Sequence, residues 1–296
     1  MTSDCRLCPR NCGVKRTDGE TGFCGQGEEI SLARASLHMW EEPCISGTQG
    51  SGTIFFSGCN MGCVFCQNRE ISFRGKGKEI PPERLCEIFW ELKTKGAHNI
   101  NLVTPTHFVP KVIKSIEMAK KDGFDLPFVY NSGGYESVET LKSLEGVIDI
   151  YMPDFKYWES ETAKKYASCP DYANFAKDAI KEMVRQCPKC RFDEKGLMKK
   201  GVIVRHMLIP SHVYEAKKII KYLFDTYKNS IVYSIMSQYT PMGEFKEFPN
   251  LNRKVKRKEY DSLTDFCIEL GIENAYIQSG ESAKGSFIPE FDFSGV

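Results

Sequence analysis

Short apolar runs alternate with amphipathic helical patterns along most of this chain, from Gly52 onward. The runs that read as buried strands cover residues 53–57, 99–104, 126–130, 147–152, 202–208, 231–236 and, last and shortest, 275–278. Strands that alternate with helices pair in parallel, with right-handed crossovers. The series predicts an α/β fold, a partial (βα)6 barrel of the TIM type. In such a barrel the chemistry lies at the carboxyl ends of the strands.

The helices predicted between these strands have clear boundaries. One begins after Pro82 and ends before Gly96, and the next begins at Val109 and ends at Gly123. The later helices are predicted over residues 137–144, 160–186 with a break near Pro170, 213–224 and 263–270. This organisation predicts a barrel over residues 46–296, preceded by a small cysteine-rich, metal-binding extension over residues 1–45.

The charge balance gives no reason to expect a nucleic-acid or membrane partner. The formal net charge is +1, and the basic run at residues 253–258 reads as the solvated start of a helix. Neither a signal segment nor an apolar stretch near the ~18 residues of a membrane span is present. These features predict a cytoplasmic protein whose thiols stay reduced. Thirteen cysteines in that compartment indicate metal or redox chemistry rather than disulfides.

Two cysteine triplets are spaced too closely for chance. With 13 cysteines in 296 residues, a specified triplet is expected about 0.02 times and a Cys-x2-Cys pair about 0.5 times. The triplets are Cys59-x3-Cys63-x2-Cys66 and Cys5-x2-Cys8-x3-Cys12. Cys187 and Cys190 form a single pair, which chance explains.

We call residues 58–66, which follow the first predicted strand, the cluster loop. Its thiolates, from Cys59, Cys63 and Cys66, can bind three irons of a cubane, and Gly58 lets the backbone turn at the start of the loop. A structural metal site without an open position has four protein ligands. Three cysteines on one loop therefore suggest that one iron of the cluster is left open to another ligand. The alternative is a zinc loop with a distant fourth ligand.

Cys-x3-Cys-x2-Cys on the loop after the first barrel strand, with Phe65 before the last cysteine, resembles the radical S-adenosylmethionine (SAM) superfamily. The resemblance implies a [4Fe–4S] cluster on Cys59, Cys63 and Cys66 whose open iron binds the amino and carboxylate groups of SAM. One electron, from a low-potential donor such as flavodoxin or ferredoxin, would cleave SAM to methionine and a 5′-deoxyadenosyl radical that abstracts hydrogen. Such an enzyme is an oxidoreductase of anaerobic chemistry, and its chain places SAM and excludes water.

The second and third strands end in polar residues suited to SAM. Most of the superfamily has a Gly-Gly-Glu-like motif after the second strand, where this chain has Thr-Pro-Thr-His. The resemblance therefore assigns the SAM amino contact to backbone or to Thr104 and Thr106. Asn131 and Ser132 begin a glycine-rich turn after the third strand, which suits close approach by ribose or carboxylate. The alternatives are an ordinary loop and a plain turn.

The fourth and fifth strands carry charges. Asp154 and Lys156 stand two residues apart and face the same side, where the ammonium and carboxylate of SAM would partner them. The alternative is a structural ion pair. Arg205 and His206 interrupt the fifth strand, and alternation lets only one of them face the barrel. The Asp-x-Lys arrangement resembles the activases of glycyl radical enzymes, which favours Arg205 as a SAM carboxylate contact, with His206 as the alternative.

The amino-terminal cysteines form a second candidate metal site. Cys5, Cys8, Cys12 and Cys24 give four thiolates within twenty residues, with glycines beside the last one. An extension this short buries little core, so a metal would stabilise it. The hypothesis is structural zinc or an auxiliary iron–sulfur cluster. Glu-Glu-Pro-Cys at residues 41–44 extends the resemblance to a branch related to pyruvate formate-lyase activating enzyme.

Together these features predict an enzyme that activates a glycyl radical enzyme or modifies another partner protein. An alternative within the same chemistry acts on a peptide or a small molecule. An alternative of another class is a non-catalytic iron–sulfur or zinc module, or an electron carrier. A carrier would need neither an open iron nor an Asp-x-Lys pair facing the barrel.

Overall fold

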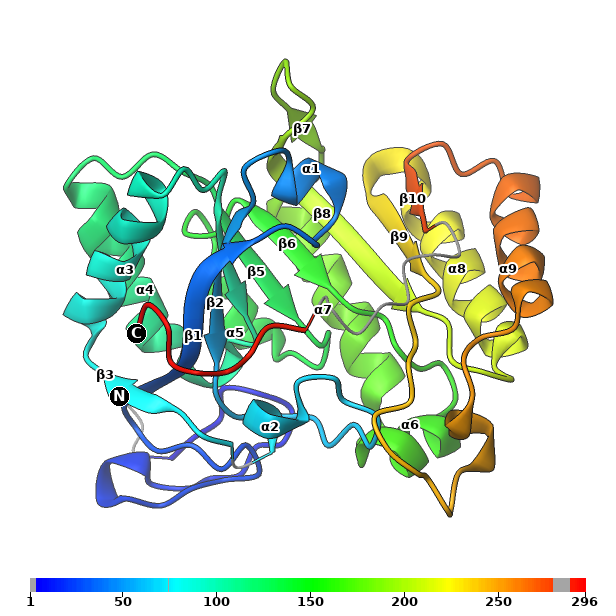
Figure 1. The fold of residues 1–296 in the computed structure, drawn as a ribbon, viewed down its shortest axis with the longest axis horizontal. Coiled ribbons are helices and arrows are strands. Elements are labelled where there is room, and N and C mark those ends of the chain that lie inside the picture. Colours follow the sequence, from blue (N-terminus) through cyan, green and yellow to red (C-terminus); the bar gives the residue numbers. More distant parts are fainter. Residues whose placement is uncertain (1–3, 74, 279–287) are drawn as a thin grey trace.

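The structure, a computed structural model, describes residues 4–73, 75–278 and 288–296. In this part of the chain one sheet has the strand order β10-β9-β8-β6-β5-β4-β2-β1-β3, and β7 pairs with β8 (Figure 1). The strands are β1 (Ile30–His38), β2 (Ser51–Phe56), β3 (Lys78–Ile80), β4 (Ile100–Val103), β5 (Phe128–Ser132), β6 (Ile150–Pro153), β7 (Arg191–Phe192), β8 (Met198–Met207), β9 (Val232–Met236) and β10 (Ala275–Ile277).

The parallel part of the sheet confirms the predicted α/β fold. β2, β4, β5, β6, β8, β9 and β10 pair in parallel and follow one another in chain order. The described strands leave β10 and β3 at opposite ends of the order, so the barrel is partial. Because all these strands point the same way, their carboxyl ends share one edge, the lower edge of the sheet in Figure 1.

The longer helices cover the outer face of the sheet, and the single-turn helices lie in connecting segments (Figure 1). The helices are α1 (Pro43–Ser46), α2 (Arg69–Ser72), α3 (Pro82–Thr94), α4 (Val109–Lys121), α5 (Val138–Lys142), α6 (Ser160–Ala167), α7 (Tyr172–Gln186), α8 (Val213–Tyr227) and α9 (Arg257–Glu269), with short 3-10 turns η1 (Arg16–Asp18), η2 (Thr106–Phe108), η3 (Lys228–Ser230) and η4 (Pro249–Asn252). The predicted break near Pro170 separates α6 from α7, since the residue before a proline disfavours helical backbone. None of the helices in the described ranges has the length and apolarity needed to cross a membrane.

The core lies between the sheet and these helices. α3 begins with a proline in its first turn, where no N–H is needed, and buries Leu85, Ile88 and Phe89. The ring of Phe89 meets that of Phe128 on β5 at a centroid distance of 5.1 Å, edge to face. The helical spacing of apolar residues on α3 and the alternation of side chains on β5 thus place these two rings against each other.

Three strands, β1, β3 and the two-residue β7, were not predicted. β1 pairs antiparallel with β2, and β3 pairs antiparallel with β1. β1 lies within the segment expected to form the amino-terminal extension, so that segment and the barrel share a sheet. The division of the chain at residue 45 stays a prediction. An antiparallel edge strand is not implied by the βα pattern, which explains why the pattern missed it.

Candidate active site

A cavity of about 270 Å³ opens at the carboxyl ends of the parallel strands. We call it the strand-end cavity. Its lining contains most of the predicted site residues: Cys59, Cys63, Phe65, Cys66, Thr104, Asn131, Ser132, Asp154, Lys156 and Arg205. These side chains come from the cluster loop and from the ends of β4, β5, β6 and β8. The fold therefore brings five segments that are distant in sequence to one place.

The cluster loop is held by backbone contacts on both sides. Gly62 N–H donates to the Ala167 carbonyl at 3.1 Å, and Val64 N–H donates to the Tyr166 carbonyl at 2.8 Å, both at the end of α6. Gly58 N–H donates to the Ile71 carbonyl at 2.8 Å, on α2. The loop is thus fixed without help from its cysteine side chains, which are left to face the cavity.

The thiols of the cluster loop suit metal ligation. Burial raises the pKa of Cys59, and the neighbouring thiols of Cys63 and Cys66 raise it further. Burial likewise raises the pKa of Cys63 to about 11, against the opposing charge of Lys156. Met61 N–H donates to the Cys59 sulfur at 3.3 Å, and the Tyr157 hydroxyl donates to the Cys63 sulfur at 3.8 Å. Both donors would stabilise thiolates once a metal had displaced the protons.

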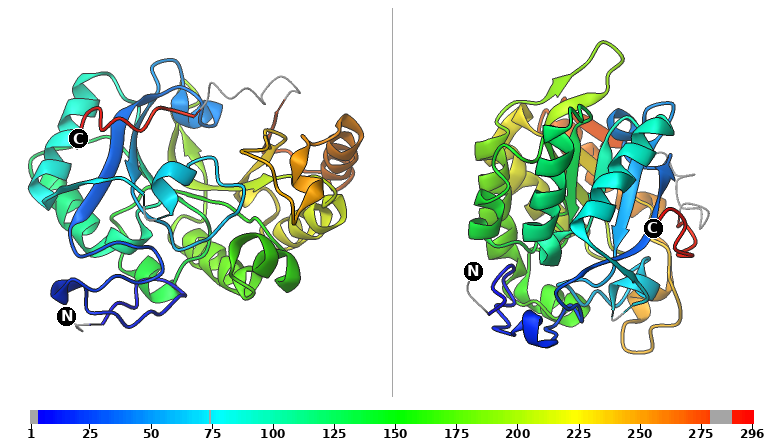
Figure 2. Two further views of the ribbon diagram at one scale, coloured as in Figure 1. Left: turned by 60° about the horizontal axis from the view of Figure 1, so that its bottom comes forward. Right: turned by 90° about the vertical axis from the view of Figure 1, so that its left-hand side faces the viewer.

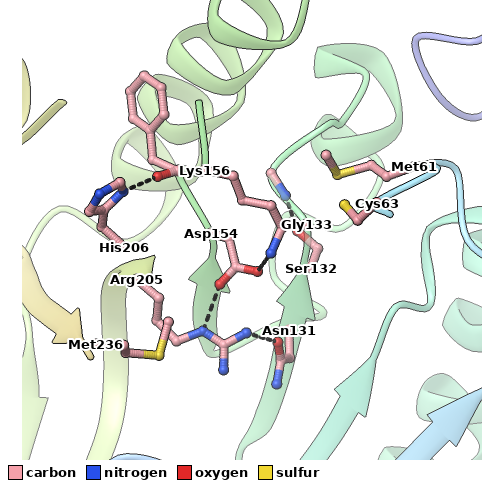
Figure 3. A network of polar contacts seen from close by, with 12 residues as sticks. Met61, Cys63, Asn131, Ser132, Gly133, Asp154, Lys156, Arg205, His206 and Met236 are labelled. Atoms are coloured by element: carbon pink, nitrogen blue, oxygen red, sulfur yellow. Dashed lines mark hydrogen bonds and ion pairs between the residues drawn. The ribbon is translucent and has the colours of Figure 1, made fainter. Parts of the chain in front are cut away.

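A network of charges crosses the cavity beside these thiols (Figure 3). Asp154 forms ion pairs with Lys156 and with Arg205, whose Nε lies 2.9 Å from Asp154 Oδ1. Arg205 Nη2 also donates to Asn131 Oδ1 at 2.7 Å. Burial alone would raise the pKa of Asp154, but Arg205 and Lys156 outweigh it and hold that pKa below its usual range. Both cations and the carboxylate are therefore charged.

Glu41 belongs to this network, although it was not among the predicted site residues. Its Oε2 lies 3.3 Å from Arg205 Nη1, and Asn101 donates to its Oε1 at 2.9 Å. Burial raises the pKa of Glu41, and Arg205 opposes that rise. Glu41 lies just beyond the end of β1, so only the pairing of β1 with β2 places it here. The Glu-Glu-Pro-Cys motif was the one sequence signal that drew attention to it.

Two of the residues predicted to contact SAM lie outside the cavity lining. His206 points away from Asp154 and Asn131, and its Nδ1 lies 2.7 Å from the Phe155 carbonyl (Figure 3). Arg205 lines the cavity instead, as strand alternation requires of neighbours. Thr106 is buried in η2, where its hydroxyl donates to Glu136 Oε1 at 2.9 Å. Of the two threonines, Thr104 is the one at the cavity, with a φ of 59° that is rare for a β-branched residue.

Glu136 provides a pH-dependent prediction. Burial raises its pKa to about 7 from an ordinary 4.5, although Thr106 and Tyr130 donate to it. Between these values the folded state binds more protons than the unfolded state, so this side chain's contribution to stability falls as the pH rises. Above pH 7, where Glu136 is ionised in the folded state, its burial lowers the free energy of unfolding by about 3 kcal/mol relative to low pH.

Replacing Glu136 with glutamine should therefore stabilise the protein relative to wild type increasingly between about pH 5 and 8, by up to about 3 kcal/mol. Urea denaturation across this pH range would measure it. Glu139→Gln is the matched control, because the Glu139 side chain is 80% exposed. A Glu136→Gln difference that does not change with pH would contradict the prediction.

The four amino-terminal cysteines lie close to the same end of the barrel. The loop that carries them, residues 5–27, runs below the carboxyl ends of the strands in Figure 1, and both views of Figure 2 show it to one side of α2. Cys5 N–H donates to the Val14 carbonyl at 2.8 Å, which folds this loop back on itself. Within the described residues, no group of three His, Cys, Asp or Glu side chains is arranged as a site for one metal ion. A cubane, by contrast, spreads its thiolates over different irons.

The comparisons with known proteins show the family of this chain. The chain belongs to the radical SAM superfamily, whose family model matches residues 53–223. It is 30% identical over 283 residues to uncharacterized protein MJ0674 of Methanocaldococcus jannaschii, covering 92% of this chain and 77% of the relative. That family implies a [4Fe–4S] cluster and SAM.

Solved structures resemble the fold. The FeFe-hydrogenase maturase HydG from Carboxydothermus hydrogenoformans has a TM-score of 0.51 and 12% identity, covering 80% of this chain and 56% of HydG. Streptococcus suis SuiB has a TM-score of 0.49 and 11% identity, covering 76% of this chain. The chain spans about half the length of SuiB, 47% of it.

Proposed function

We propose that this protein cleaves SAM reductively at a [4Fe–4S] cluster bound by Cys59, Cys63 and Cys66, and uses the resulting 5′-deoxyadenosyl radical on a partner protein. The observation that carries the proposal is that these three thiols and the Asp154–Lys156–Arg205 network line one cavity. The cluster, when bound, supplies the electron and an iron that is open to SAM. An electron carrier needs only the cluster, whereas a buried pair of cations beside a carboxylate suits an amino-acid ligand.

The charges of the strand-end cavity match the amino-acid end of SAM. Its carboxylate would be attracted by Lys156 and Arg205, and its ammonium by Asp154 and Glu41. Without the ligand these four side chains form ion pairs with one another, so no charge in the network lacks a partner of opposite sign. Thr104 and Ser132 would bind the ligand from the neighbouring strand ends. The chain would thus hold and orient SAM at the strand ends.

Exposed apolar side chains near the cavity support a macromolecular substrate over a small molecule. Trp40 and Met242 line the cavity and are 60% and 39% exposed. Phe73, 62% exposed, lines an adjoining groove that shares Met61 and Cys63 with the cavity. Apolar groups gathered on a surface often mark contact with another protein. The Asp-x-Lys resemblance points to a glycine of a glycyl radical enzyme as the target, and to a low-potential protein as electron donor.

Electron paramagnetic resonance (EPR) distinguishes these alternatives. If the proposal is right, adding SAM to the reduced, reconstituted protein changes the spectrum of the cluster, because SAM binds the open iron. An unchanged spectrum would favour an electron carrier. A glycyl radical signal on a candidate partner, formed only with SAM and reductant, would support activation. A partner protein modified without that signal would point to another type of hydrogen abstraction.

Tyr157 is predicted to tune the cluster. Its buried hydroxyl donates to the Cys63 sulfur, and hydrogen bonds to cluster sulfurs stabilise the more negative, reduced state. Tyr157→Phe should therefore make the cluster harder to reduce, which a potentiometric titration followed by EPR would measure. Tyr151→Phe is the control, since the buried Tyr151 hydroxyl bonds Gln186 instead. Equal reduction potentials in the two variants would show that the Tyr157 contact has no influence.

A further inference from the structure

Two of the four amino-terminal thiols accept hydrogen bonds of the kind that metal ligands receive. Phe23 N–H donates to the Cys12 sulfur at 3.4 Å, and the Arg16 guanidinium donates to the Cys24 sulfur at 3.3 Å. N–H donors stabilise a sulfur that carries negative charge, as in a metal thiolate.

The fold of the amino-terminal loop brings its cysteines together. Gly13 N–H donates to the Cys5 carbonyl at 3.0 Å, which places Cys5 beside the segment that carries Cys12, and Asn11 N–H donates to the Cys8 carbonyl at 3.0 Å. A Cβ added at Gly22 would lie 2.8 Å from the Cys12 sulfur, so this sulfur packs against the turn that precedes Cys24. Several negative thiolates on one such loop would repel one another unless a cation lay between them.

Other cysteines of the chain are satisfied differently. The thiols of Cys169, Cys187 and Cys190 each donate to a backbone carbonyl oxygen, Cys187 to that of Asp149 at 3.5 Å. A thiol that uses its proton in this way is part of the packing. This contrast singles out the amino-terminal four from the pair at residues 187 and 190.

The loop that carries the four thiols rests directly on the cluster loop. Arg10 Nε donates to the Asn60 carbonyl at 2.9 Å, and its Nη1 donates to the Ser168 carbonyl at 2.6 Å. The Arg10 guanidinium also stacks on Phe23, 3.7 Å from the ring centroid, between Cys12 and Cys24 in sequence. One side chain therefore joins the amino-terminal loop, the cluster loop and the end of α6.

We propose that Cys5, Cys8, Cys12 and Cys24 bind a second metal centre through four thiolates. The bound metal would hold the amino-terminal loop in place, and the contacts of Arg10 would in turn stabilise the cluster loop. Both zinc and an iron–sulfur cluster accept four thiolates. The described residues bring no three of these side chains to a single ion, so a cluster, which spreads its thiolates over several irons, fits them better than one zinc ion. The inference rests on the proposed function only for the role of the cluster loop. Binding of the second metal is independent of SAM chemistry.

Metal analysis of the full chain tests the site. The triple variant Cys59→Ala, Cys63→Ala, Cys66→Ala should keep either one zinc per chain or iron together with acid-labile sulfide. Zinc would identify a single ion and iron with sulfide a cluster. Adding Cys12→Ser and Cys24→Ser to the triple variant should remove this metal. A triple variant with a native circular dichroism spectrum and no bound metal, after both zinc loading and anaerobic iron–sulfide reconstitution, would overturn the proposal.

Arg10→Met tests the coupling. The variant should keep the amino-terminal metal but release iron from the cluster loop to a chelator several-fold faster than wild type. Arg6→Met, an exposed arginine on the same loop, is the matched control. If both variants release iron at the wild-type rate, the coupling to the cluster loop is wrong, whether or not SAM is cleaved.

Discussion

Replacing Arg205 with methionine is expected to lower the free energy of unfolding by about 3–5 kcal/mol, because it leaves buried carboxylates without their main cation. Arg205 contacts Asp154, Glu41 and Asn131 at once, and its side chain is only 15% exposed. Lys156 can still pair with Asp154, but Glu41 keeps only its bond from Asn101. Urea denaturation of the apo-protein would measure the loss.

The pH dependence of this loss provides a second check. Without Arg205 the pKa values of Asp154 and Glu41 must rise, because the cation that lowers them is gone. The deficit relative to wild type is then full above those values and shrinks as the pH falls through them and the carboxyls become neutral. Lys221→Met is the control, since it breaks an exposed pair with Asp225 that contributes less than about 1 kcal/mol. If both variants lost the same free energy of unfolding, Arg205 would not be the main cation of a buried network.

Gly58→Ala is expected to be the most damaging single-methyl change in the cluster loop. Gly58 has a φ of 81°, and an added Cβ would lie 2.6 Å from the Cys24 carbonyl oxygen and 2.5 Å from Gln26 Cγ. The left-handed backbone adds about 1–2 kcal/mol for alanine and overpacking about 1–3 kcal/mol, so a total of about 2–5 kcal/mol is expected. Because the clash involves backbone, the cluster loop and the amino-terminal loop must separate.

A matched control isolates the clash. Gly13 has a similar φ of 67° but nothing lies within 4 Å of its added Cβ, so Gly13→Ala should lose only the backbone part. Gly58→Ala should also lower the iron retained after reconstitution, whereas Gly13→Ala should not. The free energy of unfolding and the iron content of both variants would be compared. Equal effects on both quantities would mean that the two loops are not in contact.

Local patterns were sufficient to predict the parallel sheet and the residues at its strand ends. In the structure Asp154, Lys156 and Arg205 line the cavity and His206 does not. The direction of a side chain on a strand follows from its neighbours, and this separates Arg205 from His206 on β8. Lys156 lies beyond the end of β6, where its ion pair with Asp154 holds it. The serial βα pattern in turn fixes which ends of the strands meet.

Residues placed by long-range contacts were not predictable in this way. Glu41 reaches the cavity only because β1 pairs antiparallel with β2, a contact that the βα pattern does not imply. Thr106 turns toward Glu136 because η2 follows β4, and loop spacing does not determine which way a loop residue faces. The contact of Arg10 with Asn60 joins residues 50 positions apart. Tertiary packing determines these positions, and single-sequence patterns do not contain it.

Cleavage of SAM at the cluster loop can be measured anaerobically. The cluster is reconstituted, dithionite and SAM are added, and 5′-deoxyadenosine and methionine are quantified, with Cys59→Ala as the control. Wild type should form both products in equal amounts, and the variant should form none above background. Equal product from the two proteins, or cluster-loaded wild type that neither binds SAM nor forms product, would contradict this prediction.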